Sequence, residues 1–117
     1  MKTIKQTEAN IKSGITRIYK EVFGQGPDSI YVNLWDNVLT CELVGALTCL
    51  EATLIVSREG EELVHSIRNH FLSVGGDPIK HWLEEQLENK IEGRSYMINK
   101  DKNRLYTFFI FEKRIIQ

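Results

Sequence analysis

Apolar residues recur at helical spacing along the first part of the chain. Counting from Ile4, an isoleucine or valine follows at steps of 7, 4, 3 and 4 residues. These steps keep one face of a helix apolar, so the pattern predicts an amphipathic helix from Thr3 to Phe23. The segment Gly24 to Pro27 predicts its end, because glycine adopts the left-handed C-terminal position at little cost and proline cannot continue the helix.

Alternating polarity after this turn predicts a β-hairpin. In the segment from Ser29 to Trp35 the residue types alternate with the two-residue period of a strand. Asp36 and Asn37 tolerate positive φ and supply a two-residue turn. A second strand is therefore predicted from Val38 to Leu43.

Two helices are predicted in the middle of the chain. Thr48, followed three residues later by Glu51, has the form of a capping box, in which hydroxyl and carboxylate bond each other's free backbone N–H groups. The segment 57–60 (Ser-Arg-Glu-Gly) interrupts this helix. The longer helix that follows is predicted to place Leu63 in the core and to close at the glycine pair 75–76.

The remaining residues predict one more helix and a second hairpin. Asp77 and Pro78 are the residue types preferred at the N-cap and first position of a helix, which we expect to end at Gly93. Strands are then predicted over 94–99 and 105–112, joined by a polar turn.

The last strand is apolar on both faces, which is typical of a central strand or of one lying under another subunit. Phe109 is therefore predicted to lie in the core. Together these elements predict an α+β fold in the order α-ββ-α-α-ββ, with one antiparallel sheet of about four strands and helices mainly on one face. We expect a single domain over residues 1–117, assembled as a homodimer or higher homo-oligomer.

Basic and acidic residues are unevenly distributed along the chain. Residues 1–20 hold five basic and one acidic side chain, residues 21–93 hold four and thirteen, and residues 94–117 hold six and two. Two explanations are open. In the first, the basic ends fold back over the acidic middle, or the charged faces are simply solvated. In the second, a basic face and an acidic face meet between subunits or with a partner. The basic surplus is too small for a nucleic-acid interface.

The composition is that of a globular protein, with 42% hydrophobic and 26% charged residues. The sequence has no apolar run of the roughly 18 residues needed to span a membrane, and its first twelve residues lack the apolar region typical of a signal peptide. Two cysteines, Cys41 and Cys49, are too few for a disulfide scaffold or a zinc site. We therefore expect a soluble, cytoplasmic protein.

No catalytic motif, cofactor motif or metal-ligand spacing is visible, so we expect no catalytic residues, no cofactor and no metal. His65 lies four residues after Glu61, a spacing that also describes an ordinary pair on a helix surface. If a ligand site exists, we expect it between the sheet and the glycine-containing turn after the first helix. The candidate binding residues are Gly24, Gly26, Pro27, Asp36, Arg58 and His65.

Three segments resemble one known family. They are Phe23-Gly24-Gln25-Gly26-Pro27, Gly45-Ala46-Leu47-Thr48-Cys49-Leu50-Glu51 and Arg58-Glu59-Gly60-Glu61-Glu62-Leu63-Val64. Their order and spacing resemble the MpsC-like family of bacterial domains of unknown function, over nearly the whole chain. Two departures stand out: Cys49 replaces a proline that the family favours, and the family's usual acidic residue before the last turn is missing, Asn99 being its nearest equivalent here.

The family is named for a sodium-translocating, membrane-potential-generating system. The resemblance therefore implies a non-enzymatic cytoplasmic accessory or regulatory module, linked to sodium or bicarbonate transport and acting through protein or small-ligand binding. A membrane transport protein is the partner it implies. The alternative is a small-molecule sensor or an enzyme with a site near the Gly24–Pro27 loop.

Overall fold

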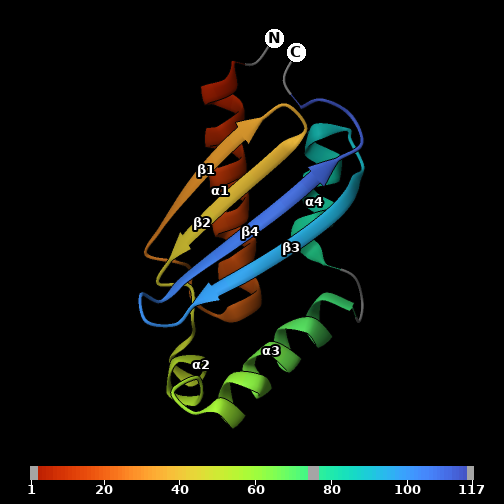
Figure 1. The fold of residues 1–117 in the computed structure, drawn as a ribbon. Coiled ribbons are helices and arrows are strands. Elements are labelled where there is room, and N and C mark those ends of the chain that lie inside the picture. The colour runs from red at the N-terminus through yellow and green to blue at the C-terminus, as the bar shows by residue number, and fades with distance from the viewer. Residues whose placement is uncertain (1–2, 74–76, 116–117) are drawn as a thin grey trace.

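The computed structural model describes residues 3–73 and 77–115 (Figure 1). In these ranges the elements are α1 (Ile4–Phe23), β1 (Ser29–Trp35), β2 (Val38–Val44), α2 (Cys49–Leu54), α3 (Arg58–Ser73), α4 (Pro78–Leu87), β3 (Ile91–Asn99) and β4 (Arg104–Phe111). This order confirms the predicted sequence of elements and the α+β class. None of the helices in the described ranges is long and apolar enough to cross a membrane.

The four strands form one antiparallel sheet in the order β1-β2-β4-β3. Each hairpin pairs its own two strands, and β2 joins β4 with Leu39 opposite Phe109. Helices α1 and α4 lie on one face of the sheet, while α2 and α3 lie beyond one end of the strands (Figure 1). The predicted sheet and the predicted central position of the last strand are therefore confirmed.

Local sequence signals determine two helix starts. Thr48 and Glu51 form the expected capping box, because Glu51 N donates to Thr48 Oγ1 at 3.1 Å and Thr48 N donates to Glu51 Oε1 at 3.0 Å. Asp77 is the N-cap of α4 and Pro78 its first residue, as predicted. The glycine pair 75–76, expected to close α3, lies outside the described residues.

The end of α4 differs from the prediction. The helix ends at Leu87 rather than at Gly93, and Glu88 adopts the left-handed region with φ 49°. The buried side chain of Asn89 donates to the Lys113 carbonyl at 2.8 Å and accepts from the Lys113 N–H at 3.1 Å. These bonds hold the backbone out of the helix, so the residues that follow join β3.

The main core lies between the sheet and helices α1 and α4. Its most deeply buried members are Ile11, Ile15, Tyr19, Leu39, Leu43, Leu83, Phe109 and Phe111. Gly14 allows α1 and α4 to approach closely, since a Cβ at this position would overlap the Trp82 ring. This close contact explains why a glycine occupies the middle of the helix, although glycine there lowers helix stability by about 1 kcal/mol relative to alanine.

Burial in α3 differs from the prediction at Leu63. This side chain is 50% exposed, because α3 turns Val64 and Arg68 toward the rest of the molecule instead. Phe109 is buried, as predicted. The outward side chains of the same strand are not covered in the described chain: Phe108 is 37% exposed and Ile110 41%.

Ion pairs connect the basic tail to the acidic middle of the chain. They join Arg94 with Asp77, Lys100 with Glu61, Arg104 with Glu42 and Arg114 with Asp36. Of the explanations considered for the charge blocks, folding back over the acidic middle is therefore confirmed for the tail.

Candidate functional site

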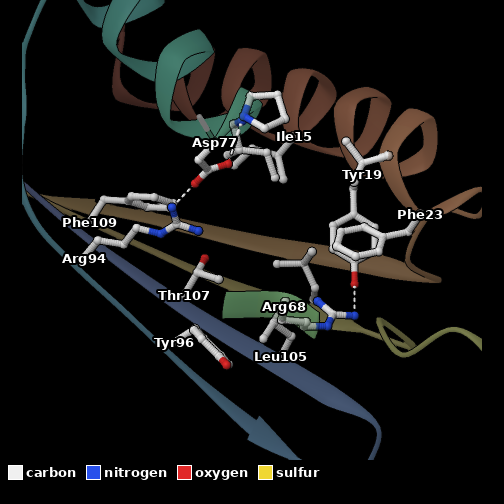
Figure 2. A pocket seen from close by; sticks show the side chains of 14 residues that line it. Ile15, Tyr19, Phe23, Arg68, Asp77, Arg94, Tyr96, Leu105, Thr107 and Phe109 are labelled. Atoms are coloured by element: carbon white, nitrogen blue, oxygen red, sulfur yellow. Dashed lines mark hydrogen bonds and ion pairs between the residues drawn. The ribbon is translucent and has the colours of Figure 1, made fainter. Parts of the chain in front are cut away.

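A pocket of about 60 Å³ lies beneath the last turns of α1 (Figure 2). It is bounded by that helix, by the start of α4 and by side chains of β2, β3 and β4. Most of its walls are apolar or aromatic, and they include Ile15, Tyr19, Phe23, Leu43, Leu105 and Phe109. Its polar groups come from Arg68, Asp77, Arg94, Tyr96 and Thr107, and we name this space the α1 pocket.

The first charged group at the α1 pocket is Arg68, which is buried together with Glu51. Its Nε and Nη2 donate to the two carboxylate oxygens of Glu51, each at 2.7 Å. Nη2 also donates to the Tyr19 hydroxyl at 2.9 Å, and that hydroxyl donates to the Ala46 carbonyl. The guanidinium lies 4.5 Å from the Phe23 ring centre. Arg68 is thus bonded to a carboxylate and stacked on an aromatic ring.

The protonation states of this cluster follow from its bonds. Burial raises the pKa of Glu51, but the hydrogen bonds from Arg68 and from the Thr48 backbone, with the charge of Arg68, outweigh it and lower the pKa below 4.5. Burial likewise lowers the pKa of Arg68, and its bonds to Glu51 and Tyr19 raise it above the usual value. Burial chiefly raises the pKa of Tyr19. At neutral pH the cluster is one cation, one anion and a neutral phenol.

The second charged group at the α1 pocket is Arg94 of β3, which forms an ion pair with Asp77. Asp77 is buried and also accepts a hydrogen bond from Ile79 N at 3.0 Å, as the N-cap of α4. The Arg94 guanidinium lies 5.6 Å from the centre of the Phe109 ring. Both arginines of the pocket are therefore paired with a carboxylate and lie over an aromatic side chain.

One predicted site residue, His65, contacts a residue that lines the α1 pocket. His65 Nδ1 lies 3.0 Å from the hydroxyl of Tyr96, a pocket residue, and the two rings are stacked at 5.9 Å between centres. The Tyr96 hydroxyl donates to Asn69 Oδ1 at 3.3 Å. His65 therefore positions Tyr96 and does not itself line the pocket.

The structure does not gather the other predicted residues at one place. Gly24 caps α1 at φ 81° and follows the pocket residue Phe23, and Gly26 and Pro27 continue the same turn. Asp36 lies at the opposite end of β1, in the hairpin turn, where it pairs with Arg114. Arg58 lies at the exposed start of α3 and pairs with Glu62.

Sequence reasoning missed Arg68 and Arg94. A signal for Arg68 was present, since it lies four residues after Val64 and so shares a helix face with that buried residue. Leu63 and Ile67 form a more apolar stripe one residue away, which concealed it. Arg94 had no such signal, because its partner Asp77 is identified only once β3 and α4 are placed together.

Metal ligands and cysteine thiols are the other groups of chemical interest in the described part of the chain. No three His, Cys, Asp or Glu side chains lie close enough there to hold a metal ion. Burial raises the pKa of Cys41 to about 12, partly offset by a hydrogen bond with Thr107. Cys41 is therefore a neutral, buried thiol at physiological pH, whereas Cys49 is exposed at the start of α2.

Comparison with known proteins places the chain in a family. A family profile described as "Na+-translocating membrane potential-generating system (MpsC)" matches residues 3–113. The chain belongs to the MpsC family. It is 26% identical over 102 residues to a Bacillus subtilis (strain 168) protein named uncharacterized protein YrhF, covering 86% of this chain and 84% of YrhF. No solved structure matches this chain.

The two departures from the MpsC-like pattern have local structural roles in this MpsC protein. Cys49 is the first residue of α2, a position where proline is also favoured because no partner for its N–H is needed. Asn99 ends β3, and its Oδ1 accepts a hydrogen bond from Lys102 N at 3.3 Å within the turn. Neither residue lines the α1 pocket.

Proposed function

We propose that this MpsC-family protein is a non-enzymatic accessory module of a sodium-translocating, membrane-potential-generating system, and that it responds to a small, uncharged, largely apolar ligand. The ligand binds in the α1 pocket, directly before the Gly24–Pro27 loop. The observation that supports this function most is an apolar pocket whose charged groups are already neutralised. The link to sodium translocation rests on the family's description.

The pairing of the two arginines argues against an anionic ligand. Arg68 is held by both oxygens of Glu51, and Arg94 by Asp77. A carboxylate entering the pocket would have to share a guanidinium with an existing carboxylate, and like charges at close range disfavour this. It would also lose its hydration against walls that are mainly apolar. An uncharged group avoids both costs.

The volume of the α1 pocket limits the size of the group that can bind inside it. A site of about 60 Å³ is smaller than the cavity of about 150 Å³ that admits benzene in other proteins. The branched end of a short aliphatic molecule is therefore a suitable probe. Isobutanol and isobutyrate share this isopropyl end and differ in the charge of the group attached to it. Larger natural ligands would place only one such group inside.

Isobutanol should bind the wild-type protein at least about tenfold more tightly than isobutyrate, because ionised carboxylates are costly to desolvate. Binding is measured by titration in ¹³C methyl NMR. Replacing Asp77→Asn together with Arg94→Gln removes both charges and should leave isobutanol affinity within about threefold. Tighter binding of isobutyrate, lost in the paired variant, would identify an anion site and refute the proposal.

The accessory role makes a separate prediction in the host cell. Deleting the gene should reduce the sodium-dependent part of the membrane potential, read with a potential-sensitive dye. Wild type should restore it, and so should Leu63→Ala, whose side chain is largely exposed. Leu105→Phe, which fills the pocket, should restore it poorly. A sodium-dependent potential unchanged by the deletion would contradict the role.

A further inference from the structure

The face of the sheet opposite α1 and α4 is uncovered in the described structure, as the front of the sheet in Figure 1 shows. Strand register places Trp35, Val38 and Ile110 next to one another across three strands. The next rows along the strands add Phe108, and then Tyr31, Tyr106 and Met97. We call this surface the outer sheet face.

The outer sheet face is unusually apolar for a surface exposed to water. Trp35 is 80% exposed, Tyr31 and Met97 are 56% exposed, and Phe108 and Ile110 contribute further apolar area. Since an aromatic side chain presents roughly 150–250 Å², these five side chains together expose on the order of 500 Å². That area lies near the upper end of the largest patches, about 300–600 Å², found on monomeric proteins.

We propose that the outer sheet face packs against the same face of a second copy of this chain, forming a two-fold homodimer. A standard interface buries about 800 Å² on each partner. The five side chains supply more than half of this, and Val38, Thr40, Val44 and Tyr106 lie beside them on the same face. Two such sheets pack about 10 Å apart with side chains interleaved.

Charge favours a second copy over a charged partner. The two charged side chains in the paired rows of the face are Glu42 and Arg104, which pair with each other at 2.5 Å. The paired rows of the face therefore carry no net charge, and two copies of them meet without like-charge repulsion. An acidic or basic partner would find no complementary charge here. Because the α1 pocket lies on the other side of the sheet, the dimer does not depend on the proposed ligand.

A group of four apolar side chains on α2, on α3 and between these helices is the competing surface. Leu50, Val56, Leu63 and Ile67 are exposed there. Exposed charged residues separate its members in the sequence, among them Arg58 and Glu62, which pair at 3.8 Å. The group is therefore less suited to a dry interface than the outer sheet face, and it provides a matched control.

Sedimentation equilibrium at micromolar concentration tests the proposal. Wild type should have twice the chain mass of 13.6 kDa, and the Phe108→Lys, Ile110→Lys variant should have the monomer mass with an unchanged circular dichroism spectrum. The Leu63→Lys, Ile67→Lys variant should remain a dimer. A wild-type monomer overturns the proposal, as does a dimer that survives the sheet variant or dissociates in the α3 variant.

Fluorescence of the unmodified protein provides a second test that needs no variant. In the dimer Trp35 is covered, so its quenching by acrylamide should fall as the protein concentration rises through the dissociation constant, while the less exposed Trp82 stays constant. Concentration-independent quenching of a fully exposed tryptophan would contradict the proposed interface.

Discussion

Replacing Arg68 by alanine should destabilise the protein by about 3–5 kcal/mol, because it leaves the Glu51 carboxylate buried without its cation. The substitution also removes the donor to Tyr19 and the stacking on Phe23. Urea unfolding followed by circular dichroism measures the loss. Arg58→Ala is the matched control, since its exposed pair with Glu62 contributes at most about 1 kcal/mol.

The contribution of this pair should depend on pH in a defined direction. The pKa of Glu51 is lower in the folded protein than its ordinary value of 4.5, so its stabilising effect is complete above about pH 4.5. It is lost as pH falls through the folded pKa. The difference in free energy of unfolding between wild type and Arg68→Ala should therefore become smaller as the pH is lowered. If Arg68→Ala lowers the free energy of unfolding by less than about 1 kcal/mol at pH 7, the stabilising role of the buried pair is contradicted.

Phe109→Ala should cost about 3–5 kcal/mol, because this ring is buried at the centre of the core between β4 and the helices. Leu63→Ala should cost less than about 1 kcal/mol, because half of that side chain is exposed and its removal leaves no cavity. Both are measured by urea unfolding under the same conditions. Similar losses for the two variants would show that the burial of α3 is misassigned.

Much of the fold was predictable because local signals agreed with one another. The two-residue turn at Asp36 and Asn37, the capping box at Thr48 and the Asp77–Pro78 helix start each act within a few residues. Where a tertiary contact decided the outcome, prediction failed. The side chain of Asn89 bonds the distant backbone of Lys113, and nothing near Asn89 in the sequence indicates that partner.

Helix α3 shows why periodicity alone missed a central site residue. Two stripes one residue apart were available: Leu63 with Ile67, and Val64 with Arg68. Hydrophobicity favours the first, but only the second places a guanidinium against the Glu51 carboxylate at the capped start of α2. The sequence thus specified the helix, and the buried ion pair selected its inward face.

The α1 pocket lies next to the loop considered from the sequence, but none of the predicted binding residues lines it. The turn beginning at Gly24 directly follows Phe23, which belongs to the pocket wall. Asp36 and Arg58 lie elsewhere because β1 separates the turn from Asp36 and α3 starts away from the sheet (Figure 1). Residues that meet through long-range pairing, such as Arg94 and Asp77, became identifiable only in the folded chain.

Xenon binding in crystals tests the central claim most directly, because xenon occupies dry apolar cavities without any charge or hydrogen bond. A xenon peak is expected in the α1 pocket, among Ile15, Leu43, Leu105 and Phe109. It should disappear in Leu105→Phe. A pocket that excludes xenon and instead holds ordered water or an anion on Arg68 and Arg94 would contradict a site for an uncharged, largely apolar ligand.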